Sequence, residues 1–460
     1  MFLTSERINY ILFHLSHHWE ENNEICDLFR FEKSENMNCI NYKNKIVFPL
    51  SNDEKIMPVT VNVLNTNIPV LFPLNSEDED LYKIDISGNL IFTHDYLKSS
   101  FYFLSGMQET EIDIRDEWGR FSFNNSIQKK LNCITIPVVN YYFEIILQGL
   151  KLFCNHNNLI FKRKRLFEKF GFFLSHDVDQ IAFYNWRQTA YKIKQLLGLS
   201  PLTYSRTLTF KLICKGLLFL INPFPKKDPW WNFNEMLNFE KELGIHSAFY
   251  FLHNENRKTA SNYKLGNNKI KSLINTLNKY GFEVGLHGTV NSAKNIENML
   301  LQVKIFVDEY SKMPLGIRQH FLCFYHPVTF ILQEKAGFKY DTTLYFAEHE
   351  GFRNGYCYPF KPYNLINESV INIWEIPLTF MEVTALKYRN IDFYELKQSV
   401  LNLIRETEKF GGIFNMLWHN STLVNYEYPG IKDFYKTLLK EIVKMNPTNI
   451  TGKEIIECFS

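Results

Sequence analysis

Two aspartates at the end of an apolar run are the first candidates for chemistry in this sequence. Residues 170–179 read FGFFLSHDVD, so Asp177 and Asp179 follow a short apolar stretch that suits a buried strand. Residues i and i+2 of a strand share a face, which lets both carboxylates converge. Such carboxylates repel each other unless a metal, a proton or another cation intervenes. The structural alternative is a helix cap or a solvated loop.

Further polar side chains lie at the ends of other strand-like runs in the second part of the chain. They are His287, Arg318, His320, Asp341 and His419. Carboxylates and imidazoles are common ligands of divalent metals, and a spare carboxylate and imidazole can serve as base and acid. Each residue alone has a structural explanation, but together they predict hydrolysis assisted by a metal.

Strand-like and helix-like patterns alternate after residue 170, and these elements must position the side chains. The strand-like runs are residues 170–179, 246–253, 282–288, 317–324, 338–344, 372–380 and 413–420. Such alternation indicates a parallel sheet or barrel, which carries its chemistry at the carboxyl ends of its strands. We therefore predict an α/β fold, with a distorted (β/α) barrel of about seven strands at 166–460. A helical insertion is expected at 181–242.

The first third of the chain has a different pattern. Helical periodicity is found at 5–21, 96–107 and 138–152, and short strand-like pieces punctuated by prolines lie between 45 and 92. These features predict a smaller α/β domain at 1–161, whose role the sequence does not indicate. The basic stretch 162–165 is interpreted as a linker.

Composition and charge argue against several classes of protein. The chain has 45% hydrophobic and 22% charged residues, which is typical of a globular protein with a sizeable core. A net charge of +2 without a basic cluster argues against nucleic-acid binding. The eight cysteines form no Cys-x-x-Cys pair, so no zinc-finger or redox motif is present. No secretory signal is recognisable at the start, which predicts a cytoplasmic location.

No apolar run approaches the roughly 18 residues of a membrane span. The nearest candidate, residues 208–224, contains Lys211 and Lys215 and suits an amphipathic helix. We expect this helix to pack on the domain, and the alternative is a weak contact with a membrane surface. The sequence indicates no oligomeric state.

The ordered motifs resemble those of the polysaccharide deacetylases with a NodB-homology domain, carbohydrate esterase family four. SHDVD resembles the first motif of that family, GLHGTVN the second, IRQHFLCF the third and LWH the last. The resemblance covers roughly residues 170–460. The first third resembles the extension that precedes such domains in some bacterial proteins.

The resemblance implies a role for each matching residue. Asp177 would be the catalytic base, and Asp179 and His287 would bind the metal, most simply Zn²⁺. Asn291 stands where the motif has a second histidine, so it is expected either as a weak ligand or as a helix cap. His320 is a candidate replacement ligand, and otherwise it shapes the cleft.

The remaining implied roles concern proton transfer. Arg318 would orient the base, and His419 would be the catalytic acid. Asp341, Glu375 and Glu382 are each possible partners of His419, with Asp341 preferred.

Taken together, the resemblance implies a metal-dependent hydrolase that removes N-acetyl groups from an amino sugar or a polysaccharide precursor. Two alternatives remain open on the same fold. One is an amidohydrolase that acts on another C–N bond. The other is a glycan-binding protein without turnover.

Overall fold

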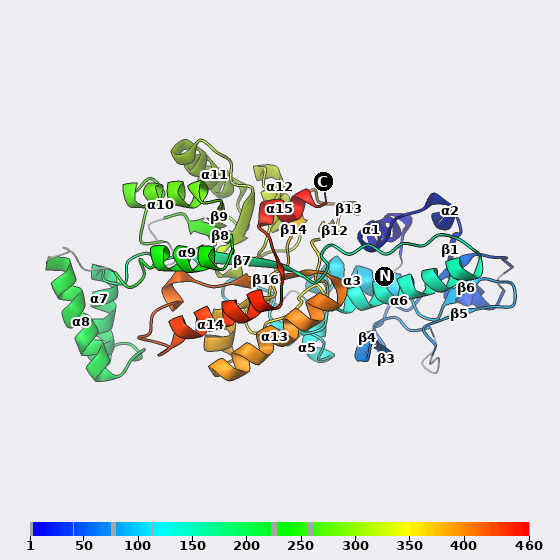
Figure 1. Ribbon diagram of the computed structural model, residues 1–460, viewed down its shortest axis with the longest axis horizontal. Helices are drawn as coiled ribbons and strands as arrows, with labels where there is room; N and C mark the ends of the chain where they lie inside the picture. Colours follow the sequence, from blue (N-terminus) through cyan, green and yellow to red (C-terminus); the bar gives the residue numbers. More distant parts are fainter. Residues whose placement is uncertain are drawn as a thin grey trace.

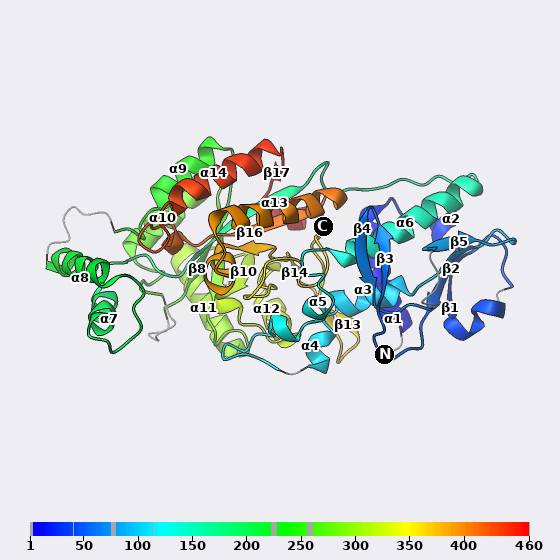
Figure 2. The ribbon, with the colours of Figure 1, turned by 90° about the horizontal axis from the view of Figure 1, so that it is seen from below.

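The computed structural model describes residues 3–39, 41–74, 80–112, 114–221, 228–254 and 261–459. Figures 1 and 2 show an elongated molecule with the N-terminal elements at one end and the parallel sheet in the middle. Two helices that follow the first strand of this sheet stand at the other end. They are α7 (Trp186–Leu196) and α8 (Arg206–Ile221).

The N-terminal region contains a four-stranded sheet, a hairpin and several helices. The sheet has the order β1 (Phe29–Lys33), β2 (Ile46–Leu50), β6 (Leu90–Phe92), β5 (Tyr82–Ile84), and the hairpin joins β3 (Val59–Val63) to β4 (Thr66–Val70). The helices are α1 (Ser5–Leu15), α2 (Asn23–Cys26), α3 (Tyr96–Leu104), α4 (Gln108–Glu111), α5 (Ile127–Lys130) and α6 (Val138–His156). The three predicted helices are present, although the first ends at Leu15 rather than at residue 21. Strand β1 was not predicted.

A parallel sheet of eight strands, with a ninth pairing beside it, organises the rest of the chain. Its order is β14 (Trp374–Glu375), β11 (Tyr340–Asp341), β10 (Gly316–Gln319), β9 (Glu283–Gly288), β8 (Ala248–Leu252), β7 (Gly171–Val178), β16 (Ile413–Leu417), β15 (Phe380–Met381). All these neighbours pair in parallel, and β17 (Thr448–Asn449) pairs with the start of β7. The sheet curls into an open half-barrel, so the predicted α/β class is confirmed.

Helices cover the sheet because both of its faces are apolar. Every residue of β7 is buried, as expected for a parallel strand covered on both sides. The covering helices are α9 (Phe233–Glu242), α10 (Asn268–Lys279), α11 (Ile296–Tyr310), α12 (Val328–Ala336), α13 (Phe393–Phe410), α14 (Ile431–Lys444) and α15 (Gly452–Glu457). In α13, Leu396, Val400 and Leu403 lie on one buried face at helical spacing. The Asp392 side chain caps its first turn.

The main sheet has eight strands where about seven were predicted, because one predicted strand corresponds to two separate strands. Residues 372–380 form β14 and β15, which are the two edges of the sheet. Pro377 lies between them and has no N–H to donate to a strand ladder. A small separate ladder joins β12 (Tyr363–Asn364) to β13 (Ser369–Val370).

The predicted strand at 317–324 is also shorter than expected. Strand β10 ends at Gln319, and His320 begins a tight turn over His320–Leu322. Phe321 and Leu322 have φ of +58° and +55°, which is an uncommon and strained conformation for residues with bulky side chains. His320 is therefore placed by a turn rather than by a strand.

One continuous apolar cluster contains side chains from both the N-terminal region and the parallel sheet, for example Phe101 and Phe414. Whether residues 1–161 form a separate domain remains a prediction. Among the described helices, none is both long enough and apolar enough to cross a membrane.

Candidate active site

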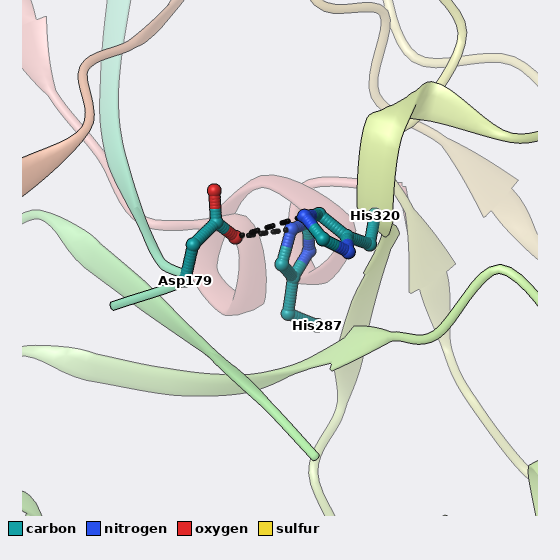
Figure 3. A group of neighbouring side chains, drawn as sticks. All are labelled: Asp179, His287 and His320. Carbon is teal, nitrogen blue, oxygen red and sulfur yellow. Dashed lines mark ion pairs between the residues drawn. The ribbon is translucent and has the colours of Figure 1, made fainter. Parts of the chain in front are cut away.

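The candidate residues come together at the carboxyl ends of the central strands. Asp177 lies in β7, and Asp179 follows its last residue. His287 in β9 is the direct neighbour of Arg318 in β10. Figure 3 shows Asp179, His287 and His320 pointing toward one another from three separate segments. These residues were expected to meet because the carboxyl ends of parallel strands lie at one edge of the sheet, and they do.

Asp177 and Arg318 form a fully buried ion pair. The Arg318 Nη1 donates to Asp177 Oδ1 at 2.9 Å, and its other donors bond Ser175 Oγ, Thr342 Oγ1 and the Thr342 carbonyl. Burial alone would raise the pKa of Asp177, but His287 and Arg318 lower it below its usual value. Asp177 is therefore a carboxylate at neutral pH, held in one orientation.

Three side chains form a cluster suited to a metal ion. The Asp179 Oδ1 lies 3.2 Å from His287 Nε2 and 3.5 Å from His320 Nε2. The three ligand atoms all lie within 4.8 Å of one another. Within the described part of the chain, the buried Asp179 Oδ1 makes no hydrogen bond. A cation is the natural partner for such an oxygen.

The orientation of His287 also fits a ligand. Its Nδ1 donates to the Arg318 carbonyl at 2.8 Å, which leaves Nε2 directed at Asp179. Metal-binding histidines usually have their second ring nitrogen fixed in this way. Burial opposes ionisation of Asp179, but His320 and His287 lower the pKa of its carboxyl. Its negative charge is thus retained at neutral pH.

His419 faces the other carboxylate oxygen of Asp179 and has a different environment. Its Nδ1 donates to Glu382 Oε1 at 2.8 Å, and its Nε2 lies 3.8 Å from Asp179 Oδ2. Glu382 Oε1 also accepts from Thr422 Oγ1 and from the His419 backbone N–H. Burial would lower the pKa of His419, but the carboxylate of Glu382 raises it to about 9. At neutral pH this imidazole is protonated.

One cleft of about 390 Å³ is lined by Asp177, Asp179, His287, His320 and His419. This volume lies within the usual range for a small-molecule site. The residues that line it are Arg120, Asp177, Asp179, His287, Gln319, His320, Phe321, Leu322, Met381, Val383, Lys387, Tyr388, His419, Ser421 and Thr422. Arg120 comes from the N-terminal region, for which the sequence predicted no site residue.

The N-terminal region contacts the cleft through the segment 115–121. Trp118 stacks on Phe321 at 4.2 Å between ring centroids, and Phe321 stacks on His320 at 4.0 Å. The Arg120 Nη1 donates to the Phe321 carbonyl at 3.3 Å, and the Arg115 Nη1 donates to the Phe324 carbonyl at 3.2 Å. These contacts hold the strained turn that carries His320.

Some predictions about individual residues need correction or remain untested. The partner of His419 is Glu382 and not the preferred Asp341, which instead accepts from Gln333 and Thr343. Glu382 directly follows β15, so the strand-end rule applied to that strand would have found it. Asn291 lies in the turn after β9 and is absent from the described lining of the cleft. Its role as a ligand remains a prediction.

Residues 3–154 match the model of a family of unknown function, DUF7033. No curated protein matches the chain.

Solved structures resemble the chain over about two thirds of its length. A putative polysaccharide deacetylase from Mycobacterium smegmatis has 13% identity and a TM-score of 0.40, covering 63% of this chain and 88% of that one. The 4-α-glucanotransferase from Thermococcus litoralis has 14% identity and a TM-score of 0.39, covering 63% and 40%. A CE4 family pseudoenzyme from Bacillus anthracis has 9% identity and a TM-score of 0.31, covering 63% and 66%.

Proposed function

We propose that this protein is a metal-dependent hydrolase that removes N-acetyl groups from an amino sugar or a polysaccharide precursor. One observation carries the proposal: a cluster of potential metal ligands, a buried carboxylate and a protonated imidazole all face one cleft. Hydrolysis of an amide needs these three functions, namely an activated water, a base and an acid for the amine that leaves.

The residues present fit a zinc ion. Asp179, His287 and His320 offer one oxygen and two nitrogens, which is a common donor set in catalytic zinc sites with an open fourth position. The lack of a hydrogen bond to Asp179 Oδ1 in the described structure supports this assignment. In this proposal His320 replaces the second histidine whose motif position is occupied by Asn291.

Asp177 would serve as the base. A bound zinc ion would supply Lewis-acid chemistry, lowering the pKa of a water from about 15.7 toward about 7 and polarising the acetyl carbonyl. Asp177 would accept the proton of the water that adds to the acetyl carbon. Arg318 keeps this carboxylate ionised and fixes its direction, since its Nη1 donates to Oδ1. The second oxygen, Oδ2, lies on the side of His287 Nε2.

His419 would serve as the acid. The C–N bond breaks only when the departing nitrogen receives a proton, because an amide anion is a very poor leaving group. The Nε2 of His419 would donate that proton, and Glu382 at Nδ1 stabilises the protonated ring beforehand. The products are acetate, which takes the oxygen of the water, and a free amino sugar, whose nitrogen takes a proton.

The test combines metal analysis with acetate release from N-acetylated chitooligosaccharides. We expect zinc to copurify with the protein or to bind on titration. Acetate release should stop with a chelator, return with zinc, and be lost in Asp177→Asn. A variant of the exposed His246, which lies outside the cleft, is the matched control and should keep full activity.

Other outcomes would assign the protein to one of the alternatives. Saturable sugar binding without acetate release, unaffected by chelator, would overturn the proposal in favour of a glycan-binding protein. Release of ammonia or an amine from a different amide would indicate another C–N hydrolase. The cytoplasmic location remains a prediction, which cell fractionation would test.

A further inference from the structure

The helical pair α7 and α8 differs from the rest of the surface in two independent ways. Figures 1 and 2 both show it at one end of the molecule, beyond the helices that cover the sheet. The two helices approach closely, since a Cβ added at Gly216 would lie 2.6 Å from Thr189 Oγ1. Thr209, Leu212 and Ile213 are buried on the same side of α8. The other side of α8 faces solvent.

The first difference is exposed apolar surface. The described residues include 27 large hydrophobic side chains that are exposed, and ten of them lie in the 36 residues from 186 to 221. Trp186 is 67% exposed, Phe210 58% and Ile221 81%. Phe210, Leu217 and Ile221 are spaced i, i+7 and i+11, so they form one stripe along α8. Clusters of this kind usually mark a contact surface.

The second difference is charge. Residues 180–221 contain no aspartate or glutamate and have six basic residues: Arg187, Lys192, Lys194, Arg206, Lys211 and Lys215. Five of them are exposed, and Lys192 is buried with its Nζ 4.2 Å from the Phe183 ring. The whole chain carries +2, so the residues outside 180–221 together carry −4. The net positive charge of the chain therefore comes from the segment that also exposes the apolar side chains.

We propose that α7 and α8 bind the surface of a membrane that contains anionic lipids. An apolar stripe bordered by lysines matches the boundary between acyl chains and negatively charged head groups. A second copy of this chain is a poorer partner, because a symmetric contact would bring two positively charged surfaces together. Neither helix is suited to cross a bilayer, so the contact is with its surface.

The position of this surface has a consequence for the cleft. Trp186 follows Asp179 by only seven residues, so the two lie at most about 25 Å apart along an extended chain. Binding through α7 and α8 would hold the cleft near the membrane. A lipid-linked carbohydrate is then a suitable substrate class, and this last step alone rests on the proposed function.

Vesicle sedimentation of the full chain tests the proposal. Vesicles of phosphatidylcholine alone are compared with vesicles of equal parts phosphatidylcholine and phosphatidylglycerol. We expect binding to the anionic vesicles, weakened by salt because the attraction is partly electrostatic. The variant Phe210→Ser, Leu217→Ser, Ile221→Ser and the variant Lys211→Glu, Lys215→Glu should each weaken binding about tenfold or more.

A matched control separates this surface from apolar exposure in general. Ile86→Ser, Ile160→Ser, Ile366→Ser removes three exposed side chains elsewhere and should bind vesicles as the wild type does. All variants should keep the wild-type circular dichroism spectrum, because the substituted side chains are exposed. Equal affinity for both vesicle types, or an equal loss in the control, would overturn the proposal. Self-association of the wild type in light scattering would also overturn the proposal if Phe210→Ser, Leu217→Ser, Ile221→Ser abolished it. A second copy of the chain would then occupy this face.

Discussion

His320 and His419 face different carboxylate oxygens of Asp179, and their protonation differs although both rings are largely buried. Burial lowers the pKa of His320 to about 4, and the nearby Asp179 offsets this only in part. Burial acts on His419 in the same direction, but Glu382 behind the ring raises its pKa to about 9. The decisive difference is the carboxylate at the second ring nitrogen.

This difference assigns the two imidazoles to different chemistry. A neutral imidazole keeps a lone pair for a metal, whereas a protonated one has a proton to give and no lone pair to bind with. The same residue type, lining one cleft, is thus suited to be a ligand at one carboxylate oxygen of Asp179 and an acid at the other.

Replacement of the residue that faces both histidines should have the largest effect. Asp179→Asn removes the negative charge that faces both rings and one proposed metal ligand. We expect loss of bound zinc and a fall of acetate release to the background rate, measured by elemental analysis and an acetate assay. A variant that retains stoichiometric zinc would show that Asp179 is not a ligand.

Replacement of the carboxylate that bonds His419 Nδ1 should lower the pKa of His419 toward that of His320. In Glu382→Gln the pKa of His419 should fall from about 9 to its ordinary value near 6.5 or below. An acid must be protonated, so activity is lost as pH rises through this pKa. The alkaline limb of the pH–rate profile should therefore move to lower pH.

At about pH 8 this shift corresponds to a rate about 30-fold lower than that of the wild type, or lower still if the pKa falls below 6.5. Zinc content should not change, because Glu382 bonds His419 and contacts none of the proposed ligands Asp179, His287 and His320 directly. An unshifted alkaline limb would remove His419 from the role of acid.

A substitution in the N-terminal region should change the zinc affinity, to which His320 contributes, and not the pKa of His419. The ring of Trp118 stacks on Phe321 and so supports the turn that carries His320. Trp118→Ala removes this support. Residues that orient a ligand typically change metal affinity 10- to 100-fold, so we expect about a tenfold weaker zinc affinity. Trp118→Phe should restore most of it, because an aromatic ring can still stack.

A calorimetric zinc titration measures this effect, and the alkaline limb of the pH–rate profile should stay in place. Equal weakening by Trp118→Ala and Trp118→Phe would contradict a role for the stacked ring.

An ion pair remote from both histidines should have the smallest effect. Arg7 and Glu368 form a bidentate pair that links α1 to the turn before β13, with Glu368 partly exposed to solvent. Partly exposed pairs contribute at most about 1 kcal/mol, so Arg7→Gln should lower the free energy of unfolding by no more than that. Denaturant titration measures this, and zinc affinity should be unchanged. A change in zinc affinity would mean that the two regions are coupled more widely than the Trp118 contact indicates.

The residues at strand ends could be predicted from the sequence, because strand pattern and strand end are both local properties. Asp177, Asp179, His287 and Arg318 were found in this way, and they lie together. The parallel α/β architecture followed from the same alternation. What remains predicted for them is their chemical role.

The partners of these residues depend on which strands are neighbours, which local pattern does not reveal. Glu382 reaches His419 because β15 pairs with β16, whereas the preferred Asp341 lies on β11, across the sheet. The turn at His320 was also missed, since residues 317–324 read as one continuous strand. Contacts such as that of Trp118 join segments about 200 residues apart and leave no sequence pattern.

Zinc stoichiometry in two histidine variants tests the central contrast most directly. His320→Ala and His419→Gln are each purified and titrated with zinc beside the wild type. We expect that His320→Ala loses stoichiometric zinc, whereas His419→Gln keeps it and loses acetate release by about 10²- to 10⁴-fold. Full zinc binding in His320→Ala, or its loss in His419→Gln, would show that the two histidines do not have the separate roles of ligand and acid.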